Sequence, residues 1–488
     1  GITMEKIKRQ SPNYMGSEIK VVISILSIAT AYMIYESMHS GSAMVNAVLV
    51  SILLMLSLSL LRLNVVVSLL LSAIFAGVVG GLNITETIEA FNTGIGSGGR
   101  TALSYALLGA FAATISKSGL PAMFASKISK KLNGVSTENQ TRKIKYLVLS
   151  FLMLAAFSSQ NIIPIHIAFI PILVPPLLFM MTKMGIDRRL IACILTFGLV
   201  SPYMFFPVGF GAIFLNDILL ANIQQSGMQT DGINAAVAML IPASGMLVGL
   251  LIAVFYSYRN KREYDLEKLE KVEGIEEGHE TPYCGRTVAI AVFAIVLAFT
   301  IQILTHSMIY GGVAGFLVFL LSGSLKWQDS DDVFTQGMRM MAMIGFIMIA
   351  AGGFAEVLRS TGDINSLVAA SADIMGDSKA IAAILMLLVG LFITIGIGSS
   401  FSTIPIIAAI YVPLALQLNF SPLAIVALVG TAAALGDAGS PASDSTLGPT
   451  AGLNIDGQHD HIWDSVVPTF IHYNLPLIAF GWIAAMVL

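Results

Sequence analysis

The segment Gly436-Asp-Ala-Gly-Ser-Pro-Ala-Ser-Asp-Ser-Thr446 lies in a region that is otherwise apolar enough to cross a membrane. It carries two carboxylates, three glycine or proline residues and four hydroxyl side chains. Glycine and proline free backbone carbonyls from helical hydrogen bonding, and a carboxylate at membrane depth is costly without a partner. The segment therefore predicts a broken helix whose carbonyls and hydroxyls, with Asp437 or Asp444, coordinate a small hard cation such as Na+.

The composition predicts an all-α polytopic membrane protein. Of the 488 residues, 56% are hydrophobic and 11% are charged, and apolar runs recur along nearly the whole chain. Cys193 and Cys284 stand far apart without a metal-ligand pattern, so neither a disulfide framework nor redox chemistry is expected. We expect the lipid bilayer and small solutes as partners, with no nucleic acid and no organic cofactor.

The distribution of basic residues predicts the topology. Lys6, Lys8, Arg9 and Lys20 indicate an N-terminus inside the cytoplasmic (inner) membrane, and the resulting span count puts the C-terminus outside. Residues 117–145 and 183–189 are both basic, so the two apolar runs between them return to the same side. The polar interruption Ser158-Ser-Gln-Asn161 favours a re-entrant hairpin with its tip there, and Gly398–Thr403 predicts a second one.

An internal repeat supports this topology. Ser158-Ser-Gln-Asn-Ile-Ile-Pro164 aligns on Ser399-Ser-Phe-Ser-Thr-Ile-Pro405, whereas Pro207 falls on Pro441 with a shift seven residues smaller. We expect an extra N-terminal helix in residues 1–42, a first repeat in 43–258, a charged cytoplasmic linker in 259–286 and an inverted second repeat in 287–488. The predicted fold has about eleven transmembrane helices, two re-entrant hairpins and two broken helices, which is typical of secondary transporters.

The motif Gly398–Pro405, followed by residues 436–446, resembles the NhaC-type Na+/H+ antiporter family. That family has a serine-rich hairpin tip and a later Gly-Asp-x-x-Ser-Pro-x-Ser-Asp-x-Thr signature. The stretch 43–120, with Leu61-Arg-Leu-Asn64, resembles a branch that includes suspected amino-acid transporters, notably of histidine. The wider ion transporter superfamily implies a homodimer in which an elevator-type transport domain moves against a fixed scaffold.

The resemblance also implies which residues form the sites. The cation site would join hydroxyls of the second hairpin to the loop with the two aspartates: Ser399, Ser400, Ser402, Thr403, Asp437, Ser440, Ser443, Asp444 and Thr446. A substrate site in the first half would use Ser158, Ser159, Asn161, Tyr203, Phe205 and Phe210, although these aromatic side chains could equally serve packing. His166, beside the first hairpin tip, is either a proton relay or a hydrogen-bonded structural residue.

The sequence favours a cation-coupled secondary transporter, and Na+/H+ exchange first, because one aspartate can bind Na+ when ionised and H+ when protonated. We expect Asp437 to titrate and Asp444 to act as a ligand. Na+- or H+-coupled symport of a small amino acid, such as histidine, or of an organic acid stays open. An intramembrane aspartyl enzyme is disfavoured because both aspartates lie in one loop. His459-Asp-His461 with Asp464 resembles a metal cluster, but such spacing more often reflects ordinary polar side chains.

Overall fold

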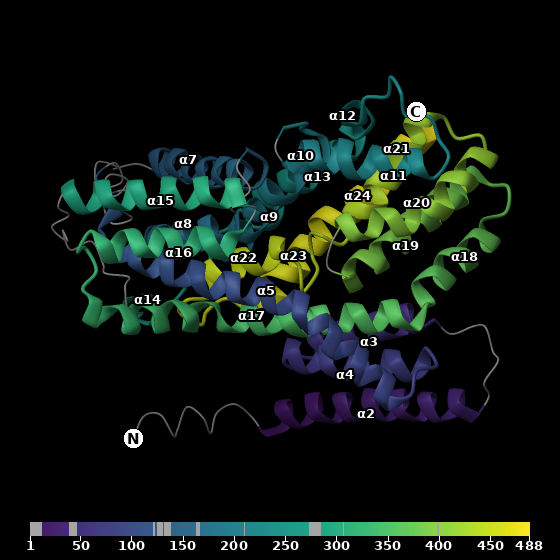
Figure 1. Cartoon of the computed structure of the whole chain (residues 1–488), viewed down its shortest axis with the longest axis horizontal. Coiled ribbons are helices and arrows are strands. Elements are labelled where there is room, and N and C mark those ends of the chain that lie inside the picture. The colour runs from purple at the N-terminus through teal and green to yellow at the C-terminus, as the bar shows by residue number, and fades with distance from the viewer. Residues whose placement is uncertain are drawn as a thin grey trace.

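The computed structural model describes residues 12–38, 46–120, 123, 130, 138–162, 166–208, 210–272, 285–305, 307–397 and 400–488. Across these ranges the chain is helical, with turns and short loops but no strand (Figure 1). In the same ranges, five helices are long and apolar enough to cross a membrane: Arg188–Phe205, Leu240–Ser257, Gly285–Thr305, Lys379–Gly396 and His461–Val487. The all-α class is confirmed, while the number of spans stays a prediction.

Two long helices, α5 (Ile84–Lys117) and α17 (Ser330–Thr361), pack along each other in opposite directions (Figure 1). Their glycines allow close approach, since a Cβ on Gly94 would lie 2.2 Å from the Gly352 oxygen. At the other end of the pair, a Cβ on Gly337 would lie 2.2 Å from the Ala110 nitrogen. Small residues of this kind let helix backbones meet where lipid offers no hydrophobic driving force.

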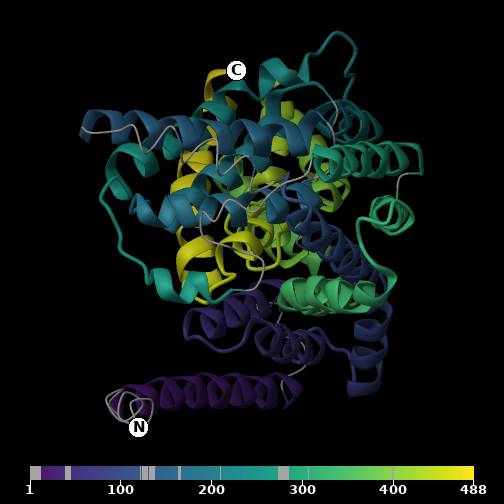
Figure 2. The same cartoon turned by 90° about the vertical axis from the view of Figure 1, so that its left-hand side faces the viewer.

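Two helical hairpins flank this pair, and each packs on the long helix from the other half of the sequence. The first is α3 (Ala47–Leu60) with α4 (Val65–Val79), and each helix begins at an asparagine N-cap, Asn46 or Asn64. The second is α15 (Gly285–Thr305) with α16 (Met308–Leu321). Helix α4 packs on α17 and α16 packs on α5, so each hairpin contacts the long helix from the other half of the sequence. Helix α2 (Pro12–Met38) lies outside α3 and α4, at the edge of the molecule (Figures 1 and 2).

The remaining helices form a second body, with the break between α21 and α22 inside it, and most of it lies above α3 and α4 in Figures 1 and 2. Its longer members are α7 (Glu138–Phe157), α8 (His166–Lys183), α9 (Arg188–Phe205), α13 (Leu240–Ile252), α18 (Asp363–Met375), α19 (Lys379–Ile397), α20 (Ser400–Gln417), α21 (Pro422–Ala434), α22 (Asp444–Leu453) and α24 (Leu475–Val487). Its short members are η1 (Ser158–Ile162), α10 (Phe210–Ala212), η2 (Ile213–Leu220), α11 (Ala221–Gln225), α12 (Ala235–Ala238), η3 (Ala253–Ser257), α14 (Leu266–Glu270), η5 (His461–Val466), α23 (Val467–Thr469) and η6 (Phe470–Asn474). Helix α21 is buried along nearly its whole length, which makes it the centre of this body.

Three pairs of helices in the second body start at a constant spacing. Helices α8 and α20 have 18 residues each and begin at residues 166 and 400, α9 and α21 begin at 188 and 422, and α10 and α22 begin at 210 and 444. All three pairs are therefore 234 residues apart. The packing repeats with the same spacing, because Gly198 meets Ala156 while Ala432 meets Gly390.

This spacing differs from that of the two serine motifs, which are 241 residues apart. Residues Ser158–Ile162 form the π-helical turn η1, which continues α7, so the predicted first hairpin tip is wrong. Helix α8 begins at His166, and residues 163–165 lie outside the described part of the chain. At the second predicted tip, Gly398–Thr403, α19 ends at Ile397 and α20 begins at Ser400, so residues 400–403 are helical. Gly398 and Ser399 lie outside the described part of the chain, and the position of this tip stays a prediction.

Candidate functional site

The helix break predicted at residues 436–446 is present. Helix α21 ends at Ala434, α22 begins at Asp444, and the chain between them runs as turns inside the core. Gly436 and Gly439 have φ of +86° and +81°, a conformation that favours glycine. A Cβ on Gly439 would also lie 2.5 Å from Cα of Phe470. The Asn474 side chain supports the loop by accepting from the Gly436 N–H at 3.1 Å and donating to the Ala438 oxygen at 2.8 Å.

Asp437 is the centre of a cluster of hydroxyl groups. Ser443 Oγ and Ser445 Oγ donate to Asp437 Oδ1 at 2.6 and 2.9 Å. Tyr203 Oη, from the last turn of α9, donates to Asp437 Oδ2 at 2.5 Å and lies 3.0 Å from Ser400 Oγ. Three hydroxyls thus donate to this carboxylate. The oxygens of the cluster come from both halves of the sequence, and Ser400 lies at the start of α20.

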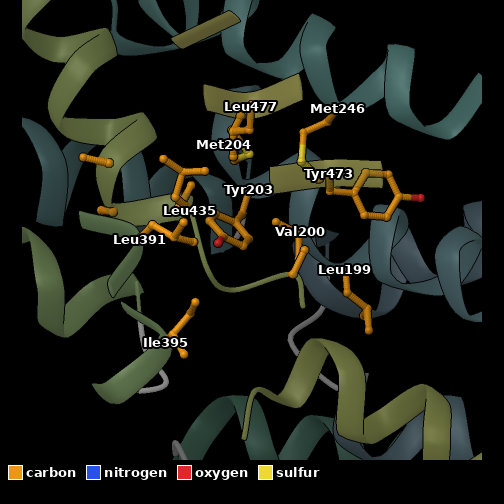
Figure 3. Close-up of a cluster of buried hydrophobic side chains, with 14 of the residues drawn as sticks. Leu199, Val200, Tyr203, Met204, Met246, Leu391, Ile395, Leu435, Tyr473 and Leu477 are labelled. Carbon is orange, nitrogen blue, oxygen red and sulfur yellow. The ribbon is translucent and has the colours of Figure 1, made fainter. Parts of the chain in front are cut away.

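The surroundings of this cluster are closely packed. Tyr203 is only 1% exposed, and its ring packs edge-on against Phe214 with centroids 4.9 Å apart. Figure 3 shows Tyr203 among apolar side chains that include Leu435 and Met204. Asp437 itself is partly buried. A charged group in such a position retains its charge only through the hydroxyl contacts or a bound cation.

The other predicted residues of the second half support the loop. Thr446 Oγ1 donates to the Ser440 and Ser443 oxygens at 2.5 and 3.1 Å, and Ser440 Oγ accepts from the Ala442 N–H. Thr403 Oγ1 lies 3.0 Å from Thr394 Oγ1 in the second hairpin. Asp444, partly buried, is the first residue of α22, where the helix dipole favours a negative charge. Ser399 and the Ser402 side chain lie outside the described part of the chain.

The predicted residues of the first half lie at the corresponding break between α9 and α10. Asn161 Nδ2 donates to the Phe206 oxygen at 3.3 Å, so η1 does face this break. Asn161 Oδ1 and Gln160 Oε1 are buried without a hydrogen-bond partner in the described chain. Ser159 bonds to its own helix, Ser158 is exposed, and Phe205 is partly buried. The side chains of His166 and Phe210 are not described, so their predicted roles stay predictions.

Sequence reasoning missed several residues of the cluster. Ser445 lies within the quoted segment, and a carboxylate eight residues before a hydroxyl across a loop could have indicated it. Asn474, an amide inside an apolar span, was a second available signal. Thr196 of α9 donates to the Ser445 oxygen at 2.8 Å and so ties the two broken helices together. Nothing in the sequence indicates that contact.

A buried ion pair joins the ends of the same two helices. Arg188, which the sequence suggested as a loop charge, donates to both carboxylate oxygens of Asp456 at 2.6 and 2.7 Å. The two side chains are 1% and 0% exposed. Burial alone would raise the pKa of Asp456, but the hydrogen bonds and charge of Arg188 outweigh it and the pKa falls below its ordinary value. The backbone N–H of Arg188 donates to the hydroxyl oxygen of Tyr264 at 3.0 Å.

Comparison with known proteins identifies the family. Residues 194–482 match the Na+/H+ antiporter family, and residues 46–132 match a second group described as a Na+-H+ antiporter family. An uncharacterized membrane protein of Vibrio parahaemolyticus is 56% identical over 446 residues, covering 91% of this chain and all of that protein. YuiF of Bacillus subtilis, named a putative amino acid transporter, is 48% identical over 450 residues, with coverage of 91% and 100%.

A solved structure, the YdaH transporter of Alcanivorax borkumensis, is 13% identical and covers 82% of this chain and 88% of that one. Its TM-score of 0.37 is too low to carry an argument about this fold. The family match spans more than half of the chain, and the relatives align over nearly all of it. The chain belongs to the Na+/H+ antiporter family, whose members are membrane transporters and not enzymes.

Proposed function

We propose that this protein exchanges Na+ for H+ across the cytoplasmic membrane, with Asp437 as the group that both ions share. The observation that carries this proposal is the Asp437 carboxylate in an unwound, core-embedded loop, contacted by hydroxyls from both halves. Asp437 Oδ1, Ser443 Oγ and Ser445 Oγ form a group of oxygens of the kind that Na+ prefers. Protonation of the carboxylate removes the negative charge, so H+ and Na+ compete for the same site.

We propose that the two halves are inverted repeats, and the spacing of their helices supports this site. Tyr203 and Asp437 are themselves 234 residues apart, the spacing at which the helices of the second body recur. Equivalent residues touch each other where a two-fold axis passes between two copies, and transporter sites lie at such interfaces. The antiparallel pair α5 and α17 agrees with oppositely inserted halves. We propose that the long helices and their hairpins form the scaffold of a homodimer and that the second body is the moving unit.

Transport by purified protein in liposomes tests the proposal. A Na+ pulse should change the internal pH of wild-type vesicles, reported by a trapped pH-sensitive dye, and Asp437→Asn should abolish the response. Asp217→Asn, which changes an exposed carboxylate on η2, is the matched control and should behave as wild type. A pH response that survives in Asp437→Asn would refute the role of Asp437.

Symport of an amino acid is the second candidate, favoured by the name of the Bacillus subtilis relative, a putative amino acid transporter. The partly buried Phe205 and the unpaired buried oxygen of Asn161 offer an apolar surface and a polar contact near the first break. Uptake of labelled histidine into the same vesicles under a Na+ gradient or a pH gradient distinguishes the two. Accumulation that requires Asp437, without a pH response to Na+ alone, would replace exchange by Na+-coupled symport.

A further inference from the structure

Four polar side chains form a continuous buried chain next to the Asp437 loop. His461 Nε2 lies 2.8 Å from the oxygen of Pro441, in that loop, and His461 Nδ1 lies 2.8 Å from Thr450 Oγ1. Thr450 Oγ1 donates to Ser465 Oγ at 2.8 Å, and Ser465 Oγ lies 2.6 Å from His459 Nε2. Both imidazoles are buried, with exposures of 1% for His459 and 7% for His461.

Counting donors shows that the hydrogen bonds along these four side chains can run in either of two directions, here called polarities. The Pro441 oxygen can only accept, so His461 Nε2 must donate to it. With Thr450 donating to Ser465, as the geometry has it, His461 Nδ1 must also donate, and His461 is then an imidazolium. In this polarity Ser465 donates to His459 Nε2, and the proton of a neutral His459 is on Nδ1.

The opposite polarity has one proton less. His459 Nε2–H then donates to Ser465, Ser465 to Thr450 and Thr450 to His461 Nδ1, which leaves His461 neutral and His459 Nδ1 without a proton. A proton that bonds to His459 Nδ1 converts this polarity into the first one, because each hydrogen moves along one bond and the charge appears on His461. Among these four side chains, His459 Nδ1 is a buried atom without a hydrogen-bond partner in the described residues, so in this polarity its lone pair can accept that proton.

We propose that His459, Ser465, Thr450 and His461 form a proton relay between the face of the molecule that carries the linker and the loop of Asp437. One proton enters at His459 Nδ1 and one leaves His461 for a carboxylate oxygen of Asp437, and no electrons move. No hydrogen bond joins His461 to Asp437 in the described residues, so the last transfer accompanies a movement of the loop. The relay rests on the proposed exchange function, for which it supplies the proton route.

The charges around His459 suit passage of a proton better than storage. Arg188 and Arg262 face His459 with positive charge, and Asp456 faces it with negative charge, while Asp460 faces His461. Burial, followed by the charge of Arg188, lowers the pKa of His459 well below its ordinary value. His459 therefore stays neutral at physiological pH and holds an extra proton only in transit.

Breaking the relay at a hydroxyl tests this inference. Ser465→Ala should lower the rate of Na+-driven proton movement in liposomes at least tenfold without changing the Na+ concentration for half-maximal rate. Exchange of 22Na+ for Na+, which needs no proton, should stay at the wild-type level in this variant. Ser465→Thr retains the hydroxyl and should restore proton movement. Where Ser465→Ala yields no folded protein, Thr450→Val provides the same break, with Thr450→Ser as its control.

The outcomes separate the relay from the exchange function. Equal proton movement in Ser465→Ala and wild type would overturn the relay and leave the exchange intact. Loss of both proton movement and 22Na+ exchange in Ser465→Ala would assign the residue to structure alone, which also overturns the relay. Wild-type vesicles that move no protons in response to Na+ would refute the exchange and the relay together.

Discussion

The buried Arg188–Asp456 pair allows a quantitative prediction about stability. Asp456→Asn removes a carboxylate that accepts two charge-assisted hydrogen bonds from a guanidinium with a 1% exposed side chain. Removal of one partner from a buried ion pair costs about 3–5 kcal/mol, because the other charge remains buried and unpaired. Arg188 would keep its bond to the Leu453 oxygen at 3.1 Å and its position 4.4 Å from the ring centre of Tyr264. We therefore expect the lower end, about 3 kcal/mol.

The temperature of half-unfolding in detergent measures this loss through intrinsic fluorescence. Glu356→Gln is the matched control because it breaks the exposed Glu356–Arg359 pair, 3.2 Å apart, and should cost at most about 1 kcal/mol. The double variant Arg188→Met with Asp456→Leu removes both charges and should unfold at a higher temperature than either single variant. A single variant no less stable than Glu356→Gln, or a double variant that is less stable than both singles, would refute this reasoning.

Three further predictions concern the break and its surroundings. Tyr203→Phe removes the hydroxyl that donates to Asp437 Oδ2 and holds this carboxylate in place, so the Na+ concentration for half-maximal exchange in liposomes should rise, by about tenfold for each ~1.4 kcal/mol that the bond contributes; an unchanged concentration would contradict it. Gly439→Ala should abolish folded protein or lower its unfolding temperature by many degrees, since φ is +81° and the new Cβ meets Phe470. Gly457→Ala, at φ +75° with open space around it, should lose only about 1–2 kcal/mol. The pKa of His459 is lowered from its ordinary 6.5, so below pH 6.5 the unfolded chain binds a proton that the folded chain does not. The free energy of unfolding therefore falls as the pH is lowered below 6.5. His459→Gln should reduce that slope by up to about 1.4 kcal/mol per pH unit, and an unchanged slope would refute the assignment.

The sequence was sufficient for the fold class and for the position of the second break, because both depend on local chemistry. Apolar composition predicts membrane helices, and glycine, proline and aspartate together predict an interruption between residues 436 and 446. The first hairpin tip was predicted wrongly because a polar motif was equated with a turn. Ser159 bonds to the Ala156 oxygen instead, so the serines remain part of a helical segment.

The contacts of Asp437 could not be predicted from the sequence to the same extent. Ser443 and Ser445 are near it in the chain, and their hydroxyls could be expected to reach the carboxylate. Tyr203 is 234 residues away, and the sequence alone suggested an aromatic pocket for an organic solute. The Arg188–Asp456 pair could not be predicted either, because a basic residue at a helix start is ordinarily a solvent-exposed charge. Long-range partners of this kind are determined by how the two halves pack.

The unequal chemistry of the two breaks follows from their contact. If the halves are inverted repeats, as proposed, residues 203 and 437 are equivalent and face each other across the axis, with Tyr203 Oη 2.5 Å from Asp437 Oδ2. Two aspartates at this distance could not both be ionised, since like charges that close share one proton. A hydroxyl opposite the carboxylate instead donates a hydrogen bond and leaves the charge available to a cation. A tyrosine in one half opposite an aspartate in the other therefore suits a cation site better than two identical aspartates would.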